Sequence, residues 1–288
     1  MGTPAFGIVF ANSGPFARPE AAAMLAEHAE RVGFESLWTV EHVVIPKDYA
    51  SVYPYNASGR APAAETSDIP DPLIWLAYVA ARTTTIRLGT GILILPQRNP
   101  LVVAKEIATL AQLSNGRVLL GVGSGWLQEE FDALDISFAD RGDRMDDHLA
   151  ALRTIWRDGR AGATHHSAFT NFDGCISLPT PPGGSVPIVI GGHTTRAARR
   201  AGELGNGFFP GKGTPDELAA LVTVMRQAAE RSGRDPSSIE LTTGAGDADT
   251  MVKLRALGFT RFAVPPPTYN LDKLPDALER TAAGLGIG

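Results

Sequence analysis

Short apolar runs alternate with longer amphipathic stretches along nearly the whole chain. The apolar runs have the length of buried strands, and helical periodicity follows each of them. In the first half, the expected strands are "FGIVF" (6–10), "SLWTV" (36–40), "TIRLGTGIL" (85–93) and "RVLLGVG" (117–123). In the second half, they are "PIVIG" (187–191), "GFFP" (207–210), "IELTT" (239–243) and "TRFAV" (260–264). Such alternation predicts a parallel sheet.

The number of these units predicts a closed barrel. Eight strand–helix units in 288 residues match an α/β chain folded as a (β/α)8 TIM barrel with insertions. No linker separates two parts, so residues 1–288 are expected to form a single domain. Residues 46–70 are polar and rich in Pro and Tyr, which is typical of a functional lid or a disordered segment. Residues 159–186 predict an excursion with a small hairpin near 169–178.

Composition narrows the class of protein. The net charge is −5 without a strong basic run, which argues against nucleic acid or an anionic membrane as the main partner. The one cysteine, Cys175, can form no internal disulfide, and the six histidines show no metal-binding spacing, so no metal is expected. The first residues do not resemble a secretory signal, and no apolar run approaches the ~18 residues of a membrane span. We expect a cytoplasmic protein that acts on a small molecule.

In a TIM barrel the active site lies at the carboxyl ends of the strands. The strand at 36–40 leads into Glu41 and His42. Neighbours on a strand point to opposite faces, so only one of these two side chains aims straight into the mouth. Histidine titrates nearest neutral pH and suits proton transfer. We therefore predict that His42 faces the pocket, while Glu41 orients a group from behind.

The strand at 187–191 leads into "GGHTT", which opens a helix. Free N–H groups at Gly191 and Gly192, with the positive end of a helix, suit a phosphate. Thr194 or Thr195 would cap the helix and contact the anion. An ordinary turn with a threonine cap predicts the same pattern, so both interpretations stay open. Three arginines follow on this helix, and they form either a solvated face or a contact for an anionic tail: Arg196, Arg199 and Arg200.

A glycine-rich turn, "LLGVGSGWLQEE" (119–130), follows the fourth expected strand. It is a poor dinucleotide fingerprint, because Trp126 stands where the third glycine would allow close helix–strand packing. It also lacks the G-x-S-x-G elbow of a serine nucleophile, which leaves Ser124 a poor candidate. In the lid-like loop, Tyr49, Tyr53 and Tyr55 indicate either an aromatic-lined entrance or a merely solvated loop.

Taken in order, the motifs resemble the luciferase-like monooxygenase family of flavin- and deazaflavin-dependent oxidoreductases, in particular the branch that uses coenzyme F420. The resemblance rests on "GFESLWTVEHVVIP", "TTTIRLGTGILILPQRNPLVVAKEIATLAQLSNGRVLLGVGSGWLQEEFDAL", "FADRGDRMDDHLAALRTIW", "VPIVIGGHTTRAARRAGELGNGFFPG" and "LRALGFTRFAV". It implies a (β/α)8 barrel with insertions, in agreement with the strand count.

The resemblance also implies roles for residues. His42 would face the flavin or deazaflavin ring as a catalytic residue, with Glu41 in the acidic place beside it. A cis peptide at Gly91–Ile92, just after Thr90, would press against the ring. The remaining expected cofactor contacts are Gly121, Gly123 and Gly125 beside the ribityl chain, Gln128 through its amide where relatives often carry Asn, and Gly191, Gly192, His193 and Thr194 at the phosphate. Asp147, where the related pattern has Glu, would shift an ion pair with Arg141 or Arg144.

The function implied is hydride transfer between coenzyme F420 and an unidentified small organic substrate. One alternative is an FMN-dependent monooxygenase of the same family, which receives reduced FMN from a separate reductase and activates O₂. A second is a cofactor-binding barrel without turnover. We further expect a homodimer and, as a separate partner, an F420 or flavin reductase. The residues do not identify the substrate.

Overall fold

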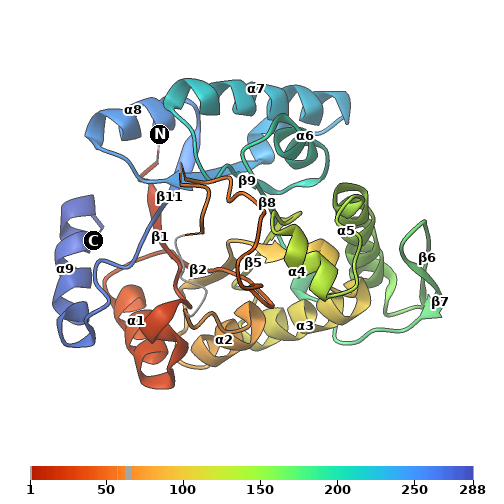
Figure 1. Cartoon of the computed structure of the whole chain (residues 1–288), viewed down its shortest axis with the longest axis horizontal. Coiled ribbons are helices and arrows are strands. Elements are labelled where there is room, and N and C mark those ends of the chain that lie inside the picture. The colour runs from red at the N-terminus through yellow and green to blue at the C-terminus, as the bar shows by residue number, and fades with distance from the viewer. Residues whose placement is uncertain (1, 57, 62–66, 288) are drawn as a thin grey trace.

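The structure is a computed structural model, and it describes residues 2–56, 58–61 and 67–287. Within this part of the chain, eight parallel strands close into a barrel, which confirms the predicted fold class (Figure 1). The barrel strands are β1 (Ala5–Val9), β2 (Ser36–Thr39), β3 (Arg87–Thr90), β5 (Val118–Gly123), β8 (Ile188–Gly191), β9 (Gly207–Phe209), β10 (Glu240–Gly244) and β11 (Phe259–Val264). Each pairs with the next in chain order, and pairing of β11 with β1 closes the ring.

A helix follows each barrel strand, and the helices surround the sheet (Figure 1). They are α1 (Pro19–Arg31), α2 (Pro72–Ala80), α3 (Pro100–Leu113), α5 (Arg141–Asp158), α6 (Thr195–Leu204), α7 (Pro215–Arg231), α8 (Ala248–Ala256) and α9 (Leu274–Leu285). The short α4 (Gln128–Ala133) is inserted before α5. Capping side chains set several starts: Asp71 accepts N–H bonds at the start of α2, and Asn99 does so at α3.

The inside of the barrel is filled by an indole. Trp38 of β2 is fully buried and clusters with Leu119 and Val189 from across the ring. Two neighbouring strands carry glycine where they face this ring: a Cβ at Gly89 would lie 2.5 Å from Trp38 Cε3, and one at Gly7 would lie 2.8 Å from its Nε1. The barrel is therefore a packed core, and ligand chemistry has room only at its ends.

The stretch expected as one strand at 85–93 is divided in two. β3 ends at Thr90, and a two-residue strand, β4 (Leu93–Ile94), pairs further along β5. Between them the Gly91–Ile92 peptide bond is cis, as the family resemblance implies. The chain bends here at the carboxyl end of the barrel.

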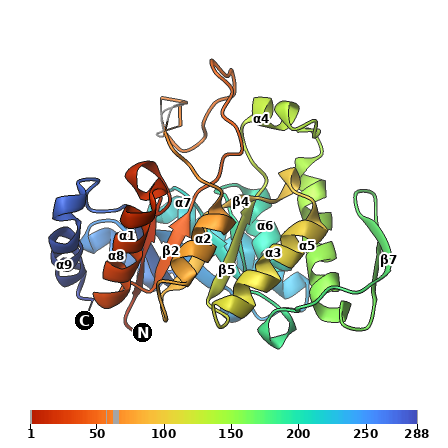
Figure 2. The same cartoon turned by 90° about the horizontal axis from the view of Figure 1, so that it is seen from below.

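Both insertions are present. The excursion carries an antiparallel hairpin of β6 (Ala163–His166) and β7 (Asn171–Cys175), whose first arm begins earlier than the expected 169–178. The loop after β2 and the inserted α4 project from the same side of the barrel (Figure 2). Residue 57 and residues 62–66 of the predicted lid lie outside the described residues. None of the helices in the described ranges is long and apolar enough to cross a membrane.

Candidate active site

The carboxyl end of β2 sends its two candidate residues in different directions. Glu41 is buried and accepts hydrogen bonds from the Arg98 guanidinium, with 2.8 Å between Oε1 and Nε, and from the Ile94 N–H. Arg98 also pairs with Asp71 at 2.6 Å. Burial raises the pKa of Glu41, although Arg98 acts in the opposite direction. Glu41 therefore belongs to an ionic network in the barrel wall.

His42, the next residue, lies on the other side of the chain. Its side chain keeps 12 % of its surface exposed, and Nδ1 lies 3.0 Å from Oε2 of Glu130. The ring of Trp126 packs against the imidazole edge-on, with 5.8 Å between centroids. β2 ends at Thr39, so both residues lie just past the strand, yet their side chains still point apart: the carboxylate enters the wall and the imidazole stays at the mouth.

Sequence reasoning missed an acidic pair on the inserted helix. Glu130 is fully buried, and its Oε1 accepts the N–H groups of Val43 and Val44 at 2.6 and 3.3 Å. Glu129 accepts the N–H groups of Ala50 and Ser51 at 2.7 and 3.0 Å. Together the two carboxylates hold the loop after β2 against α4. The only signal in the sequence was "QEE" after the glycine-rich turn.

Aromatic side chains of this loop cover the mouth. Trp126 makes edge-on contacts with Tyr49 and Tyr53, at 5.5 and 5.1 Å between centroids. Tyr55 packs on His193 at 4.8 Å. Tyr49 is buried, and burial together with the neighbouring tyrosines raises the pKa of Tyr53 to about 12. The geometry supports the aromatic-lined entrance and not the merely solvated loop.

The glycines at the end of β5 and in the turn after it are needed by the protein's own packing. A Cβ at Gly121 would lie 1.8 Å from the Thr90 carbonyl oxygen, and one at Gly123 would lie 2.7 Å from Ile92 Cδ1. Gly125 has a φ of +78°, and a Cβ there would meet Phe131 at 2.7 Å. Neighbouring strands and side chains therefore demand these glycines whether or not a ligand lies beside them, and their contact with a cofactor stays a prediction.

Ile92 links three predicted contacts into one cluster. A Cβ at Gly191 would lie 2.4 Å from Ile92 Cγ2, so the ends of β5 and β8 both leave room for this side chain. The Thr90 hydroxyl donates to the Gly121 carbonyl at 2.6 Å, which holds the bend after β3 against β5. Thr90, Gly91, Ile92, Gly123 and Gly191 therefore meet at one point of the rim.

At the end of β8 the turn differs from the predicted phosphate cradle. The Gly192 N–H is not free, because it donates to the Phe209 carbonyl at 3.3 Å, and Gly192 has a φ of +118°. Thr194 caps α6 by accepting the Ala197 N–H at 3.2 Å. Nδ1 of His193 is buried without a partner among the described residues, and burial, followed by nearby Lys212, lowers the pKa of His193. Within the described chain, this turn therefore leaves free the first N–H groups of α6, and the His193 imidazole lies beside them.

The arginines beside this turn have different environments. Arg200 is engaged, since it pairs with Asp146 and donates to the Gly142 carbonyl at 3.0 Å. Arg196 is exposed, and no acidic group of the described chain pairs with it. Nε of Arg141 is buried without a partner in the same described ranges. Burial and then the Arg196 charge lower the pKa of Arg141. Arg141 donates to the Phe138 carbonyl at 2.9 Å and lies over the Phe138 ring, but within the described chain no carboxylate pairs with either guanidinium group.

Two expectations about single residues change. Asp147 does not pair with Arg141 or Arg144; it contacts His165 at 3.2 Å and the Thr170 hydroxyl at 2.7 Å, because the hairpin packs on α5. Gln128 is exposed at the first residue of α4, and its N–H donates to the Ser51 hydroxyl at 3.1 Å. Nothing in these contacts gives its side-chain amide a direction toward the barrel mouth.

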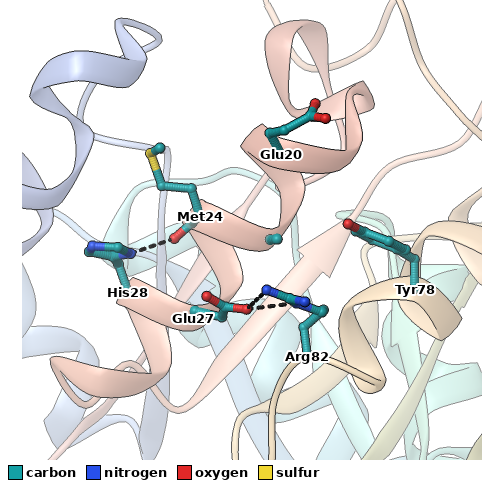
Figure 3. A pocket seen from close by; sticks show the side chains of 7 residues that line it. Glu20, Met24, Glu27, His28, Tyr78 and Arg82 are labelled. Carbon is teal, nitrogen blue, oxygen red and sulfur yellow. Dashed lines mark hydrogen bonds and ion pairs between the residues drawn. The ribbon is translucent and has the colours of Figure 1, made fainter.

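A hollow on the outer surface lies between α1 and α2, away from the strand ends (Figure 3). Its side chains satisfy one another: His28 Nδ1 lies 3.0 Å from the Met24 carbonyl oxygen, and Arg82 Nε donates to Glu27 at 2.7 Å. These are contacts of a helical surface, and they do not involve the strand ends.

A parallel barrel with an imidazole and cationic groups at the carboxyl ends of its strands defines the class of TIM-barrel proteins that act on small molecules there. The chain belongs to the luciferase-like monooxygenase family, whose model matches residues 5–246. An uncharacterized protein of Mycobacterium tuberculosis is 31 % identical over 210 residues, 73 % of this chain and 72 % of that protein. An F420-dependent glucose-6-phosphate dehydrogenase of Kineococcus radiotolerans is 29 % identical over 254 residues, 86 % of this chain and 69 % of that protein.

Solved structures share the fold. An F420-dependent secondary alcohol dehydrogenase in complex with an F420-acetone adduct superposes with a TM-score of 0.78 at 18 % identity, covering 97 % of this chain and 98 % of that chain. The oxygenating constituent of 3,6-diketocamphane monooxygenase from Pseudomonas putida, in complex with FMN, has a TM-score of 0.67 at 20 % identity, covering 100 % and 80 %.

Proposed function

We propose that this protein is an F420-dependent oxidoreductase that transfers a hydride between the deazaflavin and a small organic substrate. The observation that carries the proposal is a pair of guanidinium groups, Arg141 and Arg196, beside the start of α6, with which no carboxylate of the described chain pairs. A named relative, the F420-dependent dehydrogenase of Kineococcus radiotolerans, supports the same cofactor.

The residues at the mouth fit this cofactor. Coenzyme F420 carries a phosphate and an anionic oligoglutamyl tail, whereas FMN carries a phosphate alone. Arg141 Nε is buried without a partner in the described chain, and it is an N–H donor that an anion would satisfy; His193 Nδ1, likewise without a partner there, donates in the Nδ1–H tautomer. The start of α6 adds the positive end of a helix. Two guanidinium groups beyond it add two positive charges, and the carboxylates of an oligoglutamyl tail can pair with them in addition to the phosphate.

Each part of the mouth then has a task. When bound, the deazaflavin supplies two-electron hydride chemistry. His42 holds or moves the accompanying proton at the mouth. Trp126 and the tyrosines around it exclude water, and the turn before α6, with Arg196, binds the anionic end. The protein supplies orientation and electrostatics.

An FMN-dependent monooxygenase is the second candidate, because the structurally similar diketocamphane enzyme binds FMN. It requires reduced FMN from a separate reductase and O₂ as a second substrate. A barrel that binds cofactor without turnover is the third outcome. For each of them we expect a homodimer.

A fluorescence titration with both cofactors separates the candidates. We expect tighter binding of F420 than of FMN, and Arg196→Ala should weaken F420 binding more than FMN binding. Arg231→Ala is the matched control, since it removes the same charge from the last turn of α7. Tighter binding of FMN would favour the monooxygenase. Equal loss for both cofactors in Arg196→Ala would place the tail elsewhere.

A further inference from the structure

The imidazole at the mouth is held by a residue outside the barrel. His42 Nδ1 lies 3.0 Å from Oε2 of Glu130, which is fully buried on the inserted α4. Oε1 of the same carboxylate accepts the N–H groups of Val43 and Val44. One carboxylate therefore fixes both the ring of His42 and the backbone that follows it.

The donor and acceptor inventory decides which nitrogen carries the proton. An ionised carboxylate only accepts hydrogen bonds, so a neutral His42 must place its proton on Nδ1. Within the described chain, no group hydrogen-bonds Nε2, and the ring keeps part of its surface exposed. The nitrogen with the free lone pair is then the one left for chemistry at the mouth.

We propose that Glu130 is a positioning residue that keeps neutral His42 in the Nδ1–H tautomer, with Nε2 free to accept a proton. Its effect on turnover rests on the proposed function, whereas the tautomer itself does not. The ring orientation thus depends on α4, an insertion after β5, and not on the strand that carries His42. The adjacent Glu129 grips the same loop further on without touching the ring.

The substitution Glu130→Gln tests this by reversing one hydrogen bond. The amide oxygen can keep the N–H groups of Val43 and Val44, which leaves the NH₂ group facing His42. An NH₂ group donates, so Nδ1 must become the acceptor and the proton must move to Nε2. The shape of the side chain is nearly unchanged.

Nitrogen NMR of ¹⁵N-histidine-labelled protein reads the tautomer without any cofactor. Spectra are recorded at about pH 9, above the ordinary titration range of imidazole, and His42→Gln assigns the signal. We expect Nδ1–H in the wild type and in Glu129→Gln, the matched control, and Nε2–H in Glu130→Gln. An Nε2–H wild type, or no change in a folded Glu130→Gln, would overturn the proposal. If Glu130→Gln fails to fold, the wild-type spectrum alone still decides.

Kinetics add the consequence for turnover. We expect Glu130→Gln to lower kcat by roughly 10²–10⁴-fold, as loss of a general acid–base group does, while KM changes only a few-fold. If NMR shows the predicted tautomers but the kcat of Glu130→Gln does not fall, Glu130 still positions His42, and the use of His42 in the proposed reaction is contradicted. An Nε2–H tautomer in the wild type would overturn the positioning role of Glu130, whichever cofactor the protein uses.

Discussion

The ends of β2 and β8 open onto the same barrel mouth but are built in different ways. At β2 the functional groups are ionisable side chains, and their partners come from far along the chain: Arg98 for Glu41, and Glu130 for His42. At β8 the backbone of two glycines determines the structure: Gly191 leaves room for the Ile92 side chain, and Gly192 has a φ of +118°.

This difference separates two kinds of sensitivity. A side-chain site can lose its chemistry while the barrel stays folded. A glycine site fails by steric clash, and a substitution there disturbs stability before it reports on ligand binding. Experiments at the two ends must therefore measure different quantities.

The largest effect is expected from His42→Ala. Loss of a general acid–base group should lower kcat by roughly 10²–10⁴-fold, while the dissociation constant of F420 changes only a few-fold. Steady-state kinetics and a cofactor titration measure the two quantities. His28→Ala, on the outer helix α1, is the control. An unchanged kcat would make His42 a structural residue, and the β2 end would then no longer differ from the β8 end in carrying the reactive side chain.

Arg98→Gln should strongly destabilise the β2 end, by about 3–5 kcal/mol, because a buried carboxylate loses its partner. Burial already raises the folded-state pKa of Glu41 above its ordinary value of 4.5, and loss of Arg98 raises it further. The destabilisation is then complete above the folded pKa and shrinks as the pH falls toward the ordinary value. Urea unfolding across this pH range measures it.

The double substitution Arg98→Gln with Glu41→Gln is the control for that experiment. It removes both charges, so most of the lost stability should return at neutral pH. A double variant as unstable as Arg98→Gln would show that Arg98 acts through its packing and not through Glu41.

At the β8 end, Gly191→Ala should lower the free energy of unfolding by about 1–3 kcal/mol, the usual cost of overpacking. The new Cβ would lie 2.4 Å from Ile92 Cγ2. Gly244→Ala, at the end of β10, has nothing within 4 Å and is the matched control. Adding Ile92→Ala should restore part of the loss, and no restoration would contradict the account of this cluster.

The smallest effect concerns the anion at α6. Gly192 is unsuitable for substitution because of its positive φ, but Thr194 is exposed and caps the helix. Aspartate and asparagine both cap well, so Thr194→Asp and Thr194→Asn should keep the fold. The carboxylate should weaken F420 binding by about 1 kcal/mol more than the amide does. Equal affinities in a cofactor titration would mean that no anion binds at this helix start.

Sequence patterning was sufficient for the barrel, since each strand and helix satisfies a local rule of burial or capping. It also placed His42 and Glu41 at one strand end, and the alternation of neighbouring side chains led to the expectation that the two point apart. The partners could not be predicted in this way. Glu130 reaches His42 only because α4 folds back over the loop after β2, and no local pattern contains that contact.

The glycines could be located from the sequence, but the reason for each glycine could not be predicted. Their positions marked the rim of the barrel correctly, but nothing in the sequence indicated that packing within the protein requires Gly121, Gly123 and Gly125. A glycine that makes room for a ligand and one that makes room for Ile92 or Phe131 look identical in a sequence. Only the packed neighbours distinguish the two.

The crystal structure of the protein with F420 tests the central claim most directly, because the account divides the cofactor between the two ends. It predicts the deazaflavin ring against Gly91–Ile92 with His42 Nε2 within hydrogen-bond distance, and the phosphate at the start of α6 beside His193. A ring bound away from His42, or a phosphate far from α6, would contradict the account.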